Sequence, residues 1–312
     1  MGSRRHGGFV AAFPVRGEPR SGQTAKRSAI LRPMSQQATR LDSYFARIGY
    51  GGPATPSLDT LCSLHSLHPQ AIPFENLDPL LGRVVALDLG SIEQKLVFGG
   101  RGGYCFEQNL LFAEILRSLG FPVTGLAGRV CWNVPEGATR PRTHMALRVD
   151  LDRPYLVDVG FGGLTFTSPL WLEPDVIQET LHEPMRILRS GESLLTQVLL
   201  RGEWRSLYHF DLQPQLPVDY EMANWYLCSH PESHFRKELV AARPDAGRRY
   251  ALRNNELTIH RLDGTSERRR LASGTEIRRV LEEDFRLTPP EEPRLDDLLE
   301  EIAAGGCPSS SS

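Results

Sequence analysis

The sequence predicts an α+β fold, because helical and strand patterns occupy separate stretches of the 312-residue chain. Residues 34 to about 120 carry apolar side chains at three- and four-residue spacing, which is typical of amphipathic helices. The next stretch, to about residue 220, contains runs of branched and aromatic residues separated by turn residues, which indicates strands. The remainder mixes both patterns. We therefore divide the chain into residues 34–120, 121–220 and 221–300.

Two helices can be read within residues 34–120. A stripe of leucines between residues 58 and 67 ends before Pro73, and a second helix begins near Cys105 and stops at Gly120. Cys105 therefore lies in the first helical turn, where unpaired backbone N–H groups and the helix dipole favour a thiolate over a thiol. A buried, inert cysteine is an equally good interpretation of position alone, because free cysteine is among the most buried residue types.

A hairpin in the second stretch offers partners for this thiol. Residues 143–149 and 155–159 are strand-like runs separated by a polar, proline-containing stretch. A hairpin centred near Leu151 places His144 opposite Asp158, on one face of the sheet. Asp158 would then accept the Nδ1–H of His144 and leave Nε2 free to take a thiol proton. The competing interpretation is a structural histidine and a strand-end carboxylate, and a register shifted by one residue would separate the two side chains.

Further elements complete the prediction. Strands are expected at residues 123–130, at 193–210 with a turn at Gly202, and at 250–252 and 257–262, together with a helix near residues 230 to 240 and a charged terminal helix.

Four motifs carry a family resemblance. They are RGGYCFEQN around Cys105, IPFENLD at residues 72–78, the Thr143-His144 strand and VDVGFGG at residues 157–163. In this order and spacing the chain resembles the arylamine N-acetyltransferases, and a weaker match at residues 224–235 extends the resemblance over most of residues 34–300. The resemblance implies a helical N-terminal domain, a β-barrel second domain and an α/β lid, with a cysteine-protease-like catalytic core in which Cys105 meets His144 and Asp158.

The resemblance also implies an activity. The Cys105 thiolate would take an acetyl group from acetyl-coenzyme A and pass it to an arylamine, arylhydrazine or N-hydroxyarylamine in a ping-pong reaction. Phe74 and Phe161 correspond to aromatic residues that line the acceptor pocket of the family, although the residues themselves fit ordinary core positions equally well. Glu75 and Arg101 resemble a structural ion pair.

Composition narrows the cofactors and partners. Five scattered cysteines without a C-x-x-C pair argue against a disulfide framework and a zinc site, so no metal is expected. A net charge of −2 gives no basis for nucleic-acid binding, and no run approaches the ~18 apolar residues of a membrane span. We expect a cytoplasmic enzyme whose partners are coenzyme A and a small arylamine. The sequence leaves open the oligomeric state and the coenzyme-binding residues.

Other functions compete with this interpretation. An amide synthase of the same superfamily, acting on a polyketide-type acyl thioester, would share every residue named so far. An inactive binding scaffold would retain the fold but have an unreactive Cys105. A thiol protease or transglutaminase would also use such a triad, but the IPFENLD and VDVGFGG motifs resemble neither.

The two ends of the chain carry separate expectations. Residues 1–33 are basic, rich in Gly, Arg and Ser and without hydrophobic periodicity, which predicts a disordered extension. A transit peptide is an alternative interpretation of this composition. We prefer Met34 as the biological start, because the family-like helix at residues 41–50 opens soon after it. Residues 301–312, which end in a run of serines, are expected to form a disordered tail.

Overall fold

Helices form the N-terminal region of the computed structural model, which describes residues 34–135 and 138–306. The predicted disordered extension, residues 1–33, and the serine run lie outside the described residues. The N-terminal region contains α1 (Met34–Ile48), α2 (Leu58–Ala71), α3 (Leu77–Leu80), α4 (Leu89–Glu93), the π-helical segment η1 (Gln94–Phe98) and α5 (Cys105–Ser118). Large buried side chains such as Tyr44, Leu64 and Phe112 fill the core between α1, α2 and α5. Gly120 ends α5 with a positive φ of 90°, as the sequence predicts.

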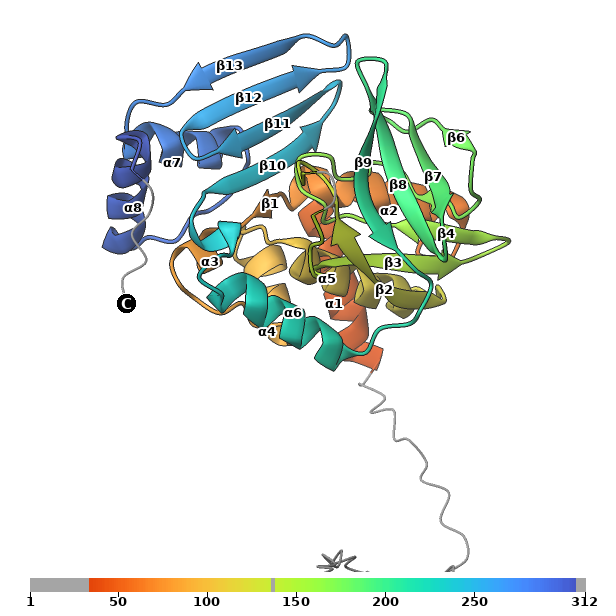
Figure 1. The fold of residues 1–312 in the computed structure, drawn as a ribbon. Coiled ribbons are helices and arrows are strands. Elements are labelled where there is room, and N and C mark those ends of the chain that lie inside the picture. The colour runs from red at the N-terminus through yellow and green to blue at the C-terminus, as the bar shows by residue number, and fades with distance from the viewer. Residues whose placement is uncertain (1–33, 136–137, 307–312) are drawn as a thin grey trace, which may run out of the picture.

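An eight-stranded antiparallel sheet follows and curls into a nearly closed barrel (Figure 1). Its spatial order is β5-β4-β3-β2-β9-β8-β7-β6. The strands are β2 (Val123–Val130), β3 (His144–Asp150), β4 (Pro154–Val157), β5 (Leu170–Trp171), β6 (Ile177–Gln178), β7 (Met185–Ser190), β8 (Ser193–Leu200) and β9 (Glu203–Phe210). The Gln178 side chain joins the two edge strands, because its amide accepts from Trp171 N and donates to Trp171 O.

The C-terminal region is a second antiparallel sheet with helices α7 and α8 on one face (Figure 1). Its order is β1-β10-β11-β12-β13, and its own strands are β10 (Val240–Asp245), β11 (Arg248–Arg253), β12 (Glu256–Arg261) and β13 (Ser266–Arg270). Leucines and isoleucines of α7 (Gly274–Glu283) and α8 (Pro293–Ala303) form a separate core with this sheet. Since α8 runs to Ala303, its last turn extends beyond residue 300, where the predicted tail begins. The division into domains stays a prediction.

The edge strand β1 (Phe74–Glu75) of this second sheet comes from the helical region. Phe74 pairs with Ala242 of β10 on one side and forms a parallel bridge with Gly103 on the other. Glu75 N donates to Gly103 O at 3.2 Å. The loop that leads into α5 is therefore continuous, through β1, with the C-terminal sheet.

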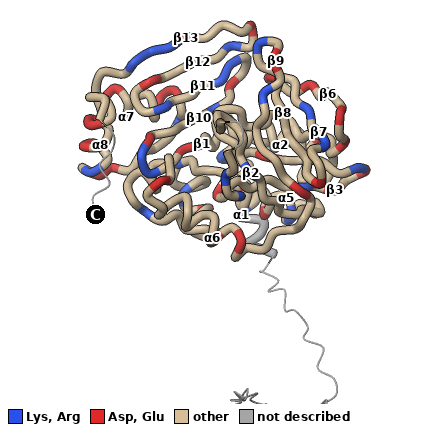
Figure 2. The backbone as a smooth tube through the Cα atoms, in the orientation of Figure 1, with Lys and Arg blue, Asp and Glu red and all other residues tan. Residues whose placement is uncertain are grey.

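The opposite edge of this sheet, β13, is exposed and basic. Figure 2 shows that Lys and Arg dominate this strand, and its three consecutive arginines are Arg268, Arg269 and Arg270. Charged side chains on an edge strand hinder pairing with another chain.

One helix differs from the prediction. Helix α6 spans Pro217–Ser229, whereas the expected helix near residues 230 to 240 is only the 3-10 turn η2 (His234–Arg236) before β10. The apolar side chains of Val218, Met222 and Trp225 are more than half exposed on α6, so periodicity gives no sign of its buried face. Among the helices of the described residues, none has the length and apolar character that crossing a membrane requires.

Candidate active site

Cys105 is the first residue of α5, as the sequence predicts. Its side chain is buried, and Sγ lies 3.6 Å from the backbone oxygen of Thr143, just before β3. The backbone N–H of Tyr104 donates to Glu107 Oε2 at 3.1 Å, which satisfies one free group at the helix start. Cys105 therefore lies at the positive end of the helix dipole and beside the strand that carries His144.

His144 and Asp158 lie in direct contact and are both buried. His144 Nε2 is 2.6 Å from Asp158 Oδ2. The predicted assignment of the ring nitrogens is wrong, because Nε2 and not Nδ1 faces the carboxylate. Because Nε2 faces Asp158, Nδ1 is the ring nitrogen left to exchange a proton with the thiol.

The nitrogen assignment follows from the register of the hairpin. The turn contains three residues, 151 to 153, so that Asp150 pairs with Pro154 and Leu147 with Val157. When this register is extended by one residue, Asp158 lies opposite Ala146. The predicted register, which placed Asp158 opposite His144, is therefore wrong. Residues 144 and 146 share a face of the strand, so contact is kept along a diagonal. A diagonal separation is longer than a direct one, which explains why the more distant nitrogen, Nε2, meets Asp158.

The buried pair is strongly coupled. Burial opposes a charge on His144, but the charge of Asp158 and its hydrogen bond, with smaller contributions from Cys105, raise the pKa of His144 to about 10. Burial likewise opposes ionisation of Asp158, yet the His144 charge and several hydrogen bonds lower the pKa of Asp158. The site therefore favours an imidazolium and a carboxylate.

Phe74 and Phe161 line the same cleft as Cys105 and His144, a space of about 1410 Å³. The Phe161 ring meets the His144 ring edge-on, with centroids 5.3 Å apart. Phe235 also lines the cleft, with its ring centroid 5.9 Å from that of Phe74, and was not among the predicted site residues. The sequence signal for it was its place at the end of the weak motif at residues 224–235.

Tyr208 was also missed. The centroid of its ring lies 4.7 Å from the ring centroid of His144 and 5.5 Å from that of Phe161. In the sequence it is one more aromatic residue in a strand, and only the pairing of β9 with β2 brings it to His144.

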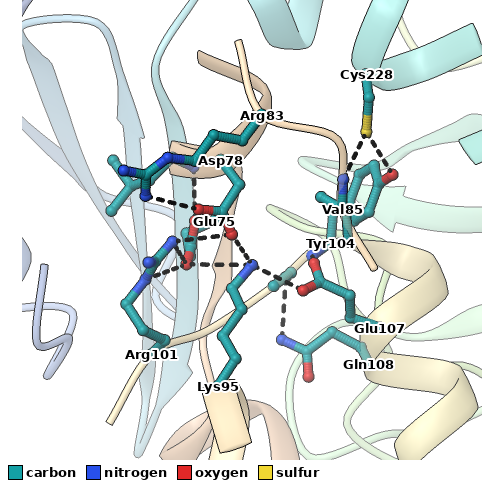
Figure 3. A network of polar contacts seen from close by, with 12 residues as sticks. Glu75, Asp78, Arg83, Val85, Lys95, Arg101, Tyr104, Glu107, Gln108 and Cys228 are labelled. Atoms are coloured by element: carbon teal, nitrogen blue, oxygen red, sulfur yellow. Dashed lines mark hydrogen bonds and ion pairs between the residues drawn. The ribbon is translucent and has the colours of Figure 1, made fainter. Parts of the chain in front are cut away.

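An ionic network holds the loop before Cys105 (Figure 3). The predicted ion pair is present, with Arg101 Nη2 2.7 Å from Glu75 Oε1. Lys95 Nζ extends the network to Asp78 Oδ2 at 2.6 Å and to Glu107 Oε1 at 2.7 Å. Burial raises the pKa of Glu107 to about 7 despite the charge of Lys95. The network therefore joins β1 and α3 to the first turn of α5, and none of its members lines the cleft.

Gly160 packs directly against the start of α5. A Cβ added there would lie 2.8 Å from Cys105 Cα and 2.9 Å from Asn109 Nδ2, so Gly160→Ala must displace the helix or the carboxylate loop. We expect a loss of about 1–3 kcal/mol in the free energy of unfolding and a roughly 100-fold slower reaction of Cys105. Denaturant unfolding and Cys105 alkylation measure the two effects. Gly163→Ala, where nothing lies within 4 Å, should keep wild-type stability, and equal stability of the two variants would refute this role.

Comparison with known proteins assigns the chain to a family. A sequence model of the N-acetyltransferase family matches residues 57–291. The arylamine N-acetyltransferase of Mycolicibacterium smegmatis is 44% identical over 245 residues, which cover 77% of this chain and 89% of that protein. The chain belongs to the arylamine N-acetyltransferase family. The arylamine N-acetyltransferase / N-hydroxyarylamine O-acetyltransferase of Salmonella typhimurium is 43% identical over 67% of this chain and 75% of its own.

The solved structures agree with this membership. The Mycobacterium marinum arylamine N-acetyltransferase in complex with CoA superimposes with a TM-score of 0.82 and 40% identity, covering 84% of this chain and 99% of that one. The α+β fold with a helical N-terminal region and a barrel-like sheet is thus that of the arylamine N-acetyltransferases. Within residues 34–135 and 138–306, no cluster of three or more His, Cys, Asp or Glu side chains is arranged to hold a metal ion.

Proposed function

We propose that this arylamine N-acetyltransferase family member transfers an acetyl group from acetyl-coenzyme A to an aromatic amine through an acetyl-cysteine at Cys105. The observation that carries the proposal is the buried Cys105, His144 and Asp158 cluster, which opens into a cleft with aromatic walls. The names of the relatives and the bound CoA of one structural neighbour agree with it.

In the first half-reaction Cys105 becomes acylated. Since the site favours an imidazolium, the thiol proton resides on His144 Nδ1, and the Cys105 thiolate attacks the carbonyl carbon of the acetyl thioester. The bond between that carbon and the coenzyme sulfur then breaks, and the coenzyme leaves as a thiol with the proton from His144. Asp158 stabilises the imidazolium during this exchange. One thioester replaces another, so the acetyl group stays activated.

In the second half-reaction an amine takes the acetyl group. The amine nitrogen attacks the acetyl carbon, His144 accepts the amine proton, and the bond to Cys105 breaks to regenerate the thiolate. Both half-reactions pass through an oxyanion, and the backbone N–H groups at the start of α5 are suitable donors for it. The result is an amide and a free enzyme.

The cleft supports both substrates. Phe74 and Phe161 provide aromatic surfaces against which an arylamine ring can stack beside the thiol. Several arginines also line the cleft and suit a negatively charged donor: Arg201, Arg205, Arg253, Arg261 and Arg268. We include N-hydroxyarylamines among the proposed acceptors, because the Salmonella relative is named for an N-hydroxyarylamine O-acetyltransferase activity.

Incubation with acetyl-coenzyme A alone tests the proposal. We expect the mass of one acetyl group to appear on the Cys105 peptide, and a small arylamine to remove it while acetylated amine accumulates. Initial velocities at several concentrations of both substrates should give the parallel double-reciprocal lines of a ping-pong reaction. A Cys105 that reacts with iodoacetamide but forms no acetyl-enzyme would favour the amide synthase. A Cys105 unreactive to both reagents would favour the inactive scaffold.

A further inference from the structure

Asn109 lies one helical turn after Cys105 on the same face of α5. Its side chain is fully buried, and its carboxamide reaches both segments that carry the other members of the triad. Nδ2 donates to Met145 O at 2.7 Å and to Asp158 Oδ1 at 3.1 Å, while Oδ1 accepts from Val159 N at 3.2 Å. Both N–H groups and the oxygen are engaged, so the carboxamide has one orientation.

We propose that Asn109 is a positioning residue, which holds the His144 strand and the Asp158 carboxylate at fixed places relative to Cys105. The inference rests on the proposed function, because it concerns the same triad. Helix α5 would then both carry the nucleophile Cys105 and orient His144 and Asp158.

The two oxygens of the Asp158 carboxylate have different hydrogen-bond partners. Oδ1 accepts from Asn109 Nδ2 and from Gly160 N at 2.9 Å. Oδ2 is then directed to His144 Nε2, at 2.6 Å. Two donors on one oxygen stop the carboxylate from rotating about its Cβ–Cγ bond, and both stabilise the ionised form that an imidazolium requires.

The bond to Met145 acts on the base. Met145 follows His144 in β3, so a fixed Met145 carbonyl fixes the backbone that carries the imidazole. The carbonyl of Thr143, the residue before His144, lies against Cys105 Sγ. Helix α5 therefore contacts the carbonyl groups of the two residues next to His144 in the chain, that of Thr143 through the thiol and that of Met145 through Asn109.

The chain contains a matched control. Asn76 is equally buried and makes the same pattern of bonds: Nδ2 donates to two backbone oxygens at 2.9 and 2.7 Å, and Oδ1 accepts from Val240 N at 2.7 Å. Its partners do not include His144 or Asp158. A substitution at Asn76 therefore also removes three hydrogen bonds of a buried carboxamide, away from the triad.

The test compares Asn109→Leu with Asn76→Leu in the full chain. Leucine keeps the shape of asparagine and removes its donors and acceptor, so both variants should melt at lower temperature. Iodoacetamide alkylation of Cys105, followed by peptide mass spectrometry from pH 5 to 10, reports on the triad. We expect Asn109→Leu to move the alkylation midpoint upward by about one pH unit, which makes the reaction ~10-fold slower at pH values below both midpoints, and to lower kcat about 100-fold. Asn76→Leu should keep the wild-type midpoint.

A wild-type midpoint in Asn109→Leu would overturn the proposal, and so would an equal shift in Asn76→Leu. If Asn109→Leu fails to fold, Asn109→Ser replaces it, since serine is smaller and keeps one donor. A shift in the same direction supports the proposal, and no shift overturns it. Alkylation needs no substrate, so a wild-type protein with a reactive Cys105 but no acetyl transfer would refute the proposed function alone.

Discussion

Cys105→Ser is expected to abolish acetyl-enzyme formation and to slow arylamine acetylation by at least ~10³-fold. A serine hydroxyl is far less acidic than a thiol, so His144 cannot hold it as an anion, and an ester of serine is a poorer acetyl donor to an amine than a thioester. The change replaces sulfur by the smaller oxygen at the start of α5. We therefore expect the melting temperature to stay near that of the wild type.

The measurement is a single-turnover assay with acetyl-coenzyme A, read by mass spectrometry and by released coenzyme thiol. Cys62→Ser is the control, because Cys62 is also a free cysteine, although it is less buried than Cys105, and it lies in α2. It should acetylate like the wild type. Acetylation of Cys105→Ser at a rate within tenfold of the wild-type rate would show that Cys105 is not the nucleophile.

Asp158→Asn should lower turnover by up to about 10⁴-fold, because it selects the wrong histidine tautomer. Asn109 Nδ2 and Gly160 N both donate to the Oδ1 position of residue 158, so the amide oxygen of the substituted side chain takes that position. Its NH₂ group then points at His144 Nε2, which must act as an acceptor. The ring proton moves to Nδ1, and Nδ1 can no longer take the thiol proton.

The same substitution should flatten the pH dependence of stability. His144 has a pKa raised from 6.5 to about 10 in the fold, so its contribution is complete below about 6.5 and is lost as pH rises through 10. Asp158 has a lowered pKa, so its contribution is present above 3.8 and is lost as pH falls through the folded value. The pair therefore contributes most between about pH 4 and 6.5.

Urea unfolding at several pH values compares Asp158→Asn with the wild type and with Asp150→Asn. Asp150 is a matched carboxylate, at the other end of β3, that pairs with Arg148. As the pH rises from 6.5 to 10, we expect the free energy of unfolding to fall in the wild type and in Asp150→Asn. In Asp158→Asn it should change less, because the buried ion pair is already absent. Parallel pH curves for all three proteins, with unchanged turnover in Asp158→Asn, would contradict the role of Asp158.

Local patterns predicted much of this site correctly. Helix α5 begins at Cys105 because a glycine-rich loop gives way there to an apolar repeat, and hairpin β8–β9 turns at Gly202 as expected. The predicted register of hairpin β3–β4 was wrong because its centre depends on the length of a turn. Pro154 begins β4, whereas the sequence pattern places it in the turn.

Other features have no local signal. Helix α6 escaped prediction because three of its large apolar side chains, those of Val218, Met222 and Trp225, face solvent while the polar Asn224 is buried. The contacts of Asn109 and Tyr208 with the triad depend on strands from distant parts of the chain. Residue spacing reveals which side chains share a helix face, but it does not reveal what that face meets.

Strand β1 has a consequence for how the cleft forms. Phe74 belongs to the helical region, yet its strand is completed by Ala242 of β10, far along the chain. Pairing across such a separation closes a long loop and is slow compared with helix formation. During folding, helix α5, which begins at Cys105, can therefore form before the pairing of β1 with β10 fixes the position of Phe74. A chain interrupted before β10 would keep the nucleophile and lose one side of the pocket that selects its acceptor.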